Sequence, residues 1–208
     1  MLTAFIIHLS SYWLSVLYLY KYDKNYTSKS LMKWKKYKKA VKISLFNQFC
    51  ITLPLLYLLK NYITKSFLNN DVSNIIIIRN ILFILTTSGL LFYGFHYMLH
   101  KPYLYKKIHK MHHEFIIPVA PASLYAHPIE HILCNNLSFL IPFIIFGTTK
   151  NISYLLIILG SIMVTSAHVD YNFPLFGYSH VIHHKKYKYN YGFGNVFDQI
   201  FSTHLGNI

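Results

Sequence analysis

Acidic residues are scarce in this chain of 208 residues, which carries six Asp and Glu side chains against twenty Lys and Arg. Cysteine is almost absent too. Cys50 and Cys134 both fall in apolar stretches, which excludes a disulfide framework and a cysteine-based zinc site. Arginine occurs once, at Arg79. Because nucleic-acid sites rely on arginine to read bases, the net charge of +14 does not indicate a nucleic-acid partner.

Long apolar runs, by contrast, are abundant, and 54% of the residues are hydrophobic. A helix needs about 20 apolar residues to cross a bilayer, and backbone groups in lipid need internal partners, so we expect these runs to be helices. Segment 43–59 contains Pro54 and polar residues, and segment 132–146 is short, so either could be tilted or re-entrant. The five expected segments are 2–20, 43–59, 75–95, 132–146 and 151–169.

The lysines divide unevenly between the two ends of these segments. Sixteen of the nineteen lie in 21–42, 101–110 and 185–188. Since lysine-rich loops stay on the cytosolic side of a membrane, we expect these three regions to face the cytosol. The last two segments form a hairpin, 132–169, that returns the chain to the same side. All the histidine clusters described next then share one membrane face.

Eight of the thirteen histidines form three clusters, with spacings H-x3-H, H-x2-HH and H-x2-HH. On a helix, residues three or four apart share a face, so we expect each cluster to present its imidazoles from one surface. Imidazole is the commonest metal ligand, and eight in this pattern indicate a site for more than one ion. The clustered residues are His96, His100, His109, His112, His113, His180, His183 and His184.

Two further histidines, His127 and His168, are predicted at the same membrane depth. Polar residues at a membrane boundary are functional candidates, and with these two the ten imidazoles would give two ions five ligands each. A metal-bound histidine usually donates its other N–H to a carboxylate or carbonyl. The carboxylates expected to accept such bonds are Glu114, Glu130, Asp170 and Asp198.

The ligand set limits the chemistry without choosing the metal. No Glu-x-x-His pair occurs, which excludes the carboxylate-bridged di-iron site of ferritin-like bundles. An all-histidine site suits iron, zinc, copper or nickel. Eight to ten ligands are too many for one hydrolytic zinc ion, so two redox ions that activate dioxygen are the more economical interpretation. A non-catalytic metal-binding or metal-transport membrane protein is the alternative, although transport ligands are expected near the membrane midplane.

These histidines stand in motifs that resemble the fatty acid hydroxylase superfamily of membrane oxygenases. His-Tyr-Met-Leu-His from His96 is followed by Ile-His-Lys-Met-His-His-Glu-Phe from Ile108 and Tyr-Ala-His-Pro-Ile-Glu from Tyr125. Ala-His-Val-Asp-Tyr from Ala167 and the third cluster continue the pattern, which covers about residues 31–203. The motifs look most like those of C-4 methylsterol monooxygenases. Sterol C-5 desaturases come next, then fatty acid or alkane hydroxylases.

The resemblance implies an integral enzyme of the endoplasmic reticulum with two histidine-bound iron ions, for which zinc can substitute in preparations. It implies the use of dioxygen and of electrons from NAD(P)H through cytochrome b5 and its reductase. The eight clustered histidines match the family's metal ligands, and His127 and His168 match its additional histidines. The expected reaction is hydroxylation of an unactivated C–H bond of a membrane lipid, with the C-4 methyl group of a sterol as the leading substrate.

We therefore predict an all-α integral membrane protein with four to five membrane-spanning or re-entrant helices and a histidine-rich helical cap on the cytosolic side. The whole chain, 1–208, is expected to form one membrane-embedded domain of the fatty acid hydroxylase type. Its first part, 1–95, would supply mainly transmembrane helices, and 96–208 the histidine-bearing catalytic region with the hairpin 132–169.

Overall fold

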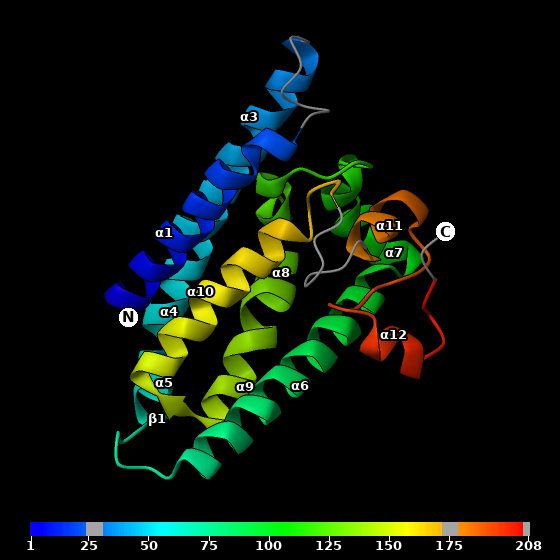
Figure 1. Cartoon of the computed structure of the whole chain (residues 1–208). Coiled ribbons are helices and arrows are strands. Elements are labelled where there is room, and N and C mark those ends of the chain that lie inside the picture. Colours follow the sequence, from blue (N-terminus) through cyan, green and yellow to red (C-terminus); the bar gives the residue numbers. More distant parts are fainter. Residues whose placement is uncertain (24–30, 172–178, 206–208) are drawn as a thin grey trace.

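The computed structural model describes residues 1–23, 31–171 and 179–205, which are helical apart from two very short strands and the connecting loops (Figure 1). The α-helices are α1 Leu2–Leu19, α3 Leu31–Phe46, α4 Leu53–Leu58, α5 Lys60–Lys65, α6 Asn74–Leu99, α7 Pro102–Lys107, α8 Pro128–Glu130, α9 Ser138–Phe146, α10 Lys150–Ser166, α11 Ser179–Lys186 and α12 Val196–Ile200. The 3-10 segments are η1 Tyr20–Tyr22, η3 His109–Glu114 and η4 Ala120–Leu124, and the π-helical segments are η2 Asn47–Thr52 and η5 His131–Leu137.

Among the residues that the structure describes, four helical stretches are long and apolar enough to cross a membrane: Leu2–Tyr22, Lys33–Leu58, Asn74–Leu99 and Pro128–Phe146. The predicted all-α membrane fold is confirmed. The second and fourth segments, which could have been tilted or re-entrant, belong to helical stretches of 26 and 19 residues. The last predicted segment is shorter than expected, since α10 has 17 residues.

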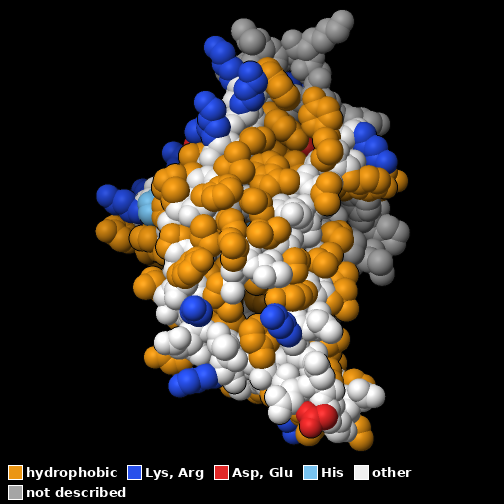
Figure 2. Space-filling model, turned by 90° about the vertical axis from the view of Figure 1, so that its left-hand side faces the viewer, with side chains coloured by type: hydrophobic (Ala, Val, Ile, Leu, Met, Phe, Trp, Pro, Cys, Tyr) orange, Lys and Arg blue, Asp and Glu red, His pale blue; other side chains and the backbone are white. Residues whose placement is uncertain are grey.

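The outer surface of the bundle suits a lipid environment. Figure 2 shows a broad apolar band, with basic side chains gathered above it and a few below. Exposed large apolar side chains occur along α1 and α6, including Leu14, Leu17 and Ile78. Such a surface would be unfavourable in water and is stable against acyl chains.

Polar residues within the apolar helices face other parts of the protein. The side-chain amide of Asn47 donates to the carbonyl oxygens of Leu124 and Ala126, both at 2.9 Å. The His131 ring, which is buried, lies 2.8 Å from the Thr52 hydroxyl. These pairs satisfy polar groups that lipid could not. The bonds of Asn47 tie the second helical stretch to the loop carrying η4, and the Thr52–His131 pair ties it to η5.

The hairpin of α9 and α10 turns at the end of the bundle opposite the histidines. Thr148 and Thr149 form β2, which pairs in parallel with β1, Phe67–Leu68. Gly147 has a φ of 64°, and a Cβ there would lie 2.3 Å from the Ser66 carbonyl oxygen, so the turn requires glycine. From this turn α10 runs alongside α1 and ends beside α11, close to the C-terminal end of α6 (Figure 1).

Candidate metal centre

Nine of the ten histidines predicted as ligands converge on two points. Within each set, one nitrogen of every imidazole lies within 4.8 Å of the others. The five-histidine group consists of His96, His100, His109, His113 and His183. The four-histidine group consists of His112, His168, His180 and His184. The predicted two ions would therefore have five and four histidine ligands.

Each H-x2-HH cluster is divided between the two groups, unlike the predicted single surface. In the H-x2-HH cluster of η3, His109 and His113 belong to the five-histidine group, while His112 belongs to the four-histidine group. In α11 the division is reversed, and only His183 joins the five-histidine group. Adjacent residues differ by about 100° around a helix, so neighbouring histidines can reach two different ions. The clusters thus connect the two groups.

The distances between ring nitrogens match those of ligands on a shared ion. The Nε2 of His109 lies 3.0 Å from the Nε2 of both His96 and His113. In the four-histidine group, the Nε2 atoms of His168 and His180 are 3.1 Å apart. Two nitrogens bound at about 2.1 Å to one ion lie about 3.0–3.4 Å apart when the ligand angle is about 90–110°.

The hydrogen bond made by Nδ1 of each ring shows that its Nε2 is the nitrogen free to bind a metal. The Nδ1 of His183 lies 2.6 Å from the carbonyl oxygen of Tyr189, and that of His184 lies 2.9 Å from the carbonyl oxygen of Phe115. A carbonyl only accepts, so each Nδ1 carries the proton and each Nε2 presents a lone pair. Converging lone pairs repel one another unless a cation lies between them. The residues therefore fit a metal ion in each group.

Burial keeps these imidazoles neutral in the metal-free protein. It lowers the pKa of His100 to about 2 and that of His112 to about 4, from an ordinary value of 6.5. The pKa values of His109 and His183 also lie well below 6.5, because of burial first and neighbouring imidazoles second. Since a metal binds the neutral ring, no proton has to be removed at pH 7.

Glu130 is a buried acidic residue that lies beside one histidine of each group. Its Oε2 lies 2.9 Å from Nδ1 of His109, and its Oε1 lies 3.9 Å from Nδ1 of His112. The same Nδ1 of His112 is 3.2 Å from the carbonyl oxygen of Tyr125. The 2.9 Å separation is that of an ion pair without hydrogen-bond geometry, and a carboxylate beside a metal-bound histidine is a common arrangement.

Asp198 supports His96 through the backbone. Its two carboxylate oxygens accept the N–H groups of Tyr191 and Gly192, both at 2.7 Å. The Tyr191 carbonyl oxygen in turn lies 2.6 Å from Nδ1 of His96. A Cβ at Gly192 would lie 2.7 Å from Oδ2 of Asp198, so this close approach requires glycine. Asp198 was expected to accept a bond from a histidine directly, but it acts on His96 through the loop that it holds.

The three remaining predicted site residues make other contacts. His127 lies in neither group, and its Nδ1 accepts a backbone N–H at 3.2 Å in the first turn of α8. Glu114 is exposed and forms a 3.0 Å ion pair with Lys39. Asp170 forms a 3.0 Å ion pair with Lys185. The structure brings none of these three polar side chains into the two histidine groups.

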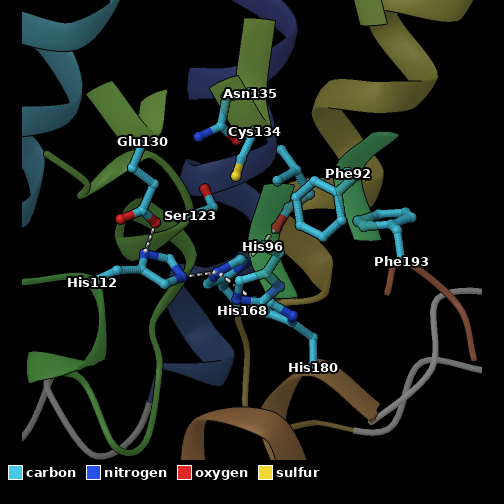
Figure 3. Close-up of a pocket in the computed structure, with 11 residues that line it drawn as sticks. Phe92, His96, His112, Ser123, Glu130, Cys134, Asn135, His168, His180 and Phe193 are labelled. Carbon is cyan, nitrogen blue, oxygen red and sulfur yellow. Dashed lines mark hydrogen bonds and ion pairs between the residues drawn. The ribbon is translucent and has the colours of Figure 1, made fainter. Parts of the chain in front are cut away.

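A small cavity adjoins the four-histidine group (Figure 3). Its volume of about 20 Å³ is room for about one water molecule. Imidazoles line one side, and the opposite wall includes part of the π-helical η5, a kind of turn that is frequent at functional sites. Apart from the imidazoles and Glu130, the lining residues are Phe92, Ser123, Cys134, Asn135, Val164 and Phe193.

The sequence reasoning missed this cavity wall and the carbonyl groups that orient the histidines. The carbonyls of Phe115 and Tyr191 carry no side-chain signal. Cys134 and Asn135 reach the cavity through the π-helical register of η5, which hydrophobic periodicity does not reveal. One usable signal was the polar side chain of Asn135 inside an apolar segment.

Comparisons with known proteins agree with this site. The fatty acid hydroxylase family profile matches residues 81–203, a range that contains all nine converging histidines. Methylsterol monooxygenase 2-1 of Arabidopsis thaliana is 28% identical over 171 residues, which cover 76% of this chain and 62% of that protein. No solved structure matches the chain.

Two other relatives are more similar over a shorter region. Fatty acid hydroxylase domain-containing protein 2 of Homo sapiens is 38% identical over 115 residues, 54% of this chain and 34% of that protein. A fatty acid hydroxylase of Mycosarcoma maydis is 40% identical over 116 residues, 54% of this chain and 30% of that protein. The match thus spans about a third of the length of these two relatives. Since the family profile covers more than half of the chain, the chain belongs to the fatty acid hydroxylase family, whose members are membrane-bound, oxygen-dependent oxidoreductases.

Proposed function

We propose that the protein is a membrane-bound di-iron oxygenase that hydroxylates an unactivated C–H bond of a lipid, with the C-4 methyl group of a sterol as the leading substrate. The observation that carries this proposal is the convergence of nine neutral imidazoles on two points. The five-histidine group would hold one iron ion and the four-histidine group the other. Family membership favours iron over zinc, because zinc binds the same nitrogens but has no redox chemistry.

When bound, the two iron ions supply the reductive activation of dioxygen and the oxidising power needed to break a C–H bond. Insertion of one oxygen atom from dioxygen consumes two electrons and two protons, so an external electron donor is required. We propose NAD(P)H as the source, through cytochrome b5 and its reductase. Basic side chains near the histidines, such as Lys101 and Lys185, would favour an acidic donor.

The chain's own residues position the metals and exclude water. Glu130 orients His109, and the loop held by Asp198 orients His96. The cavity beside the four-histidine group lies against α6 and η5, which belong to candidate membrane spans, so a lipid would reach it from the bilayer side. Phe92 and Phe193 would shield the reacting carbon from solvent.

We infer that the histidine-bearing end faces the cytosol, in the membrane of the endoplasmic reticulum. The support is the distribution of lysines, of which sixteen of nineteen lie at that end by sequence. Residues 24–30, part of the first lysine-rich region, lie outside the described residues. Glycosylation acceptor sites placed in 69–72 and in 185–188 test the orientation, and modification is expected only at the first.

The substrate is tested in a yeast strain that lacks its C-4 methylsterol oxidase. We expect expression of the protein to remove the accumulated 4,4-dimethyl sterols, and the His183→Ala variant, which lacks a proposed ligand, to leave them unchanged. Persistence of these sterols despite folded, iron-loaded protein would reject the sterol substrate. Assays for sterol C-5 desaturation and for hydroxylation of fatty acids or alkanes then test the nearest alternatives. Failure to consume dioxygen with any lipid would favour a non-catalytic metal-binding protein.

A further inference from the structure

The cavity beside the four-histidine group is lined by one amide that has no hydrogen-bond partner. Asn135 lines this cavity, and its side chain makes no hydrogen bond within the described part of the chain. Two other polar residues that line the cavity lie against neighbouring side chains. The Ser123 hydroxyl contacts the Tyr12 hydroxyl at 3.0 Å, and Glu130 contacts His109 at 2.9 Å.

The membrane setting makes a free amide at this position significant. Asn135 is only half-buried and belongs to the candidate span Pro128–Phe146. A polar side chain without a partner is unfavourable in an apolar medium, so such residues in membrane spans mark ligand sites. The neighbouring residue Asn136, by contrast, has a hydrogen-bond partner within the protein, because its amide donates to the His131 carbonyl oxygen at 2.8 Å. The Asn135 amide is left for a molecule that enters the cavity.

The position of Asn135 restricts which part of a ligand it can contact. Asn135 and Cys134 lie across the cavity from His168 and His180 (Figure 3). Because the cavity measures about 20 Å³, a group that touches the amide lies within a few ångströms of the four-histidine group. An amide offers two N–H donors and one oxygen acceptor, which suits a hydroxyl or carbonyl group.

Building on the proposed function, we propose that Asn135 positions the substrate by hydrogen bonding to an oxygen carried one or two carbons away from the carbon that is oxidised. The substrate class is then a lipid that carries a hydroxyl or carbonyl group within two carbons of its reacting carbon. An unsubstituted methylene in the middle of an acyl chain lacks such an oxygen. A methyl group on C-4 of a sterol has one, because C-3, two bonds from the methyl carbon, bears the hydroxyl group. The four-histidine group is accordingly the one that faces the substrate.

Equilibrium binding to the full-length, zinc-loaded protein in lipid nanodiscs tests this assignment without turnover. The probes are a radiolabelled 4,4-dimethyl sterol with its 3-hydroxyl and the same sterol without it. We expect the wild-type protein to bind the hydroxylated sterol about five- to tenfold more tightly, the value of one hydrogen bond. Asn135→Leu should bind both sterols equally, with unchanged affinity for the deoxy sterol. The matched control is Asn151→Leu on an exposed position of α10, which should keep the wild-type preference.

The possible outcomes separate this assignment from the proposed function. Equal binding of the two sterols by the wild-type protein, or an unchanged preference in Asn135→Leu, would overturn the role of Asn135 alone. An equal loss of affinity for both sterols in Asn135→Leu would show a general contribution to the cavity and would also overturn it. Binding of neither sterol by the wild-type protein would reject the sterol substrate and this assignment with it. If Asn135→Leu fails to retain two zinc ions, Asn135→Ala takes its place.

Discussion

Oε2 of Glu130 lies 2.9 Å from Nδ1 of His109, and both side chains are almost completely buried. The other carboxylate oxygen is 3.9 Å from Nδ1 of His112. One carboxylate therefore faces a histidine from each group. Two divalent ions with neutral imidazole ligands leave an excess of positive charge in the protein interior, and Glu130 is placed to offset part of it.

Replacement of Glu130 by glutamine should weaken metal binding about ten- to a hundredfold, because the charge is lost while the size of the side chain is kept. Competition with a chelator, followed by metal analysis, measures the change. Glu114→Gln is the matched control, since Glu114 is exposed and pairs with Lys39. Equal metal affinity in the two variants would show that the Glu130 carboxylate has no part in holding the ions.

Gly192→Ala should disturb the loop that orients His96, because the new Cβ would lie 2.7 Å from Oδ2 of Asp198. We expect a loss of about 1–3 kcal/mol in the free energy of unfolding and a lower metal content. Thermal unfolding in detergent and metal analysis test both effects. Gly94→Ala is the control, since nothing lies within 4 Å of a Cβ there and alanine favours the helix. Two variants of equal stability would contradict this account of the loop.

Acid should destabilise the metal-free protein. Burial holds the pKa of His100 at about 2 and that of His112 at about 4 in the folded state, whereas an unfolded histidine has a pKa of about 6.5. Below about pH 6.5 the unfolded chain takes up protons that the folded chain does not, so the free energy of unfolding falls as the pH falls. Unfolding midpoints between about pH 8 and pH 5 measure this. A midpoint that rises toward pH 5 would show that the histidines are not buried in neutral form.

His127→Ala should leave the metal content unchanged, because His127 lies in neither histidine group and its Nδ1 accepts a backbone N–H of α8. A small loss of stability, about 0.5–2 kcal/mol, is expected from the lost helix cap. Metal analysis and thermal unfolding of the purified variant separate the two effects. Loss of one ion per chain would restore His127 as a ligand, as the family resemblance implies.

Spacing alone predicted eight of the nine histidines that converge, and the ninth, His168, was predicted from its membrane depth. Topology supported this, because the hairpin ending near His168 returns the chain to the same face. The division of each H-x2-HH cluster between the two groups could not be predicted. It depends on the direction in which each imidazole projects from η3 and α11. Because η3 is a 3-10 helix, its residues are spaced differently around the axis than in an α-helix.

The contacts of the carboxylates were harder to predict than the ligands. Proximity in sequence placed Glu114 beside His113, yet its side chain turns outward to Lys39. Glu130 stands 21 residues after His109, and only the folded chain shows their contact. Asp198 acts through the backbone of Tyr191, a relationship without any signal in side-chain chemistry. Interactions between distant segments decided these three positions.

The most direct test of the central claim is the number of iron ions per chain, measured by elemental analysis of protein purified from iron-replete cells. Two ions per chain are predicted for the wild-type protein. The His168→Ala variant should lose the ion of the four-histidine group and keep the other, giving one ion per chain. A wild-type value of one or less, or an unchanged value of two in His168→Ala, would contradict the assignment of the two histidine groups as a pair of iron sites.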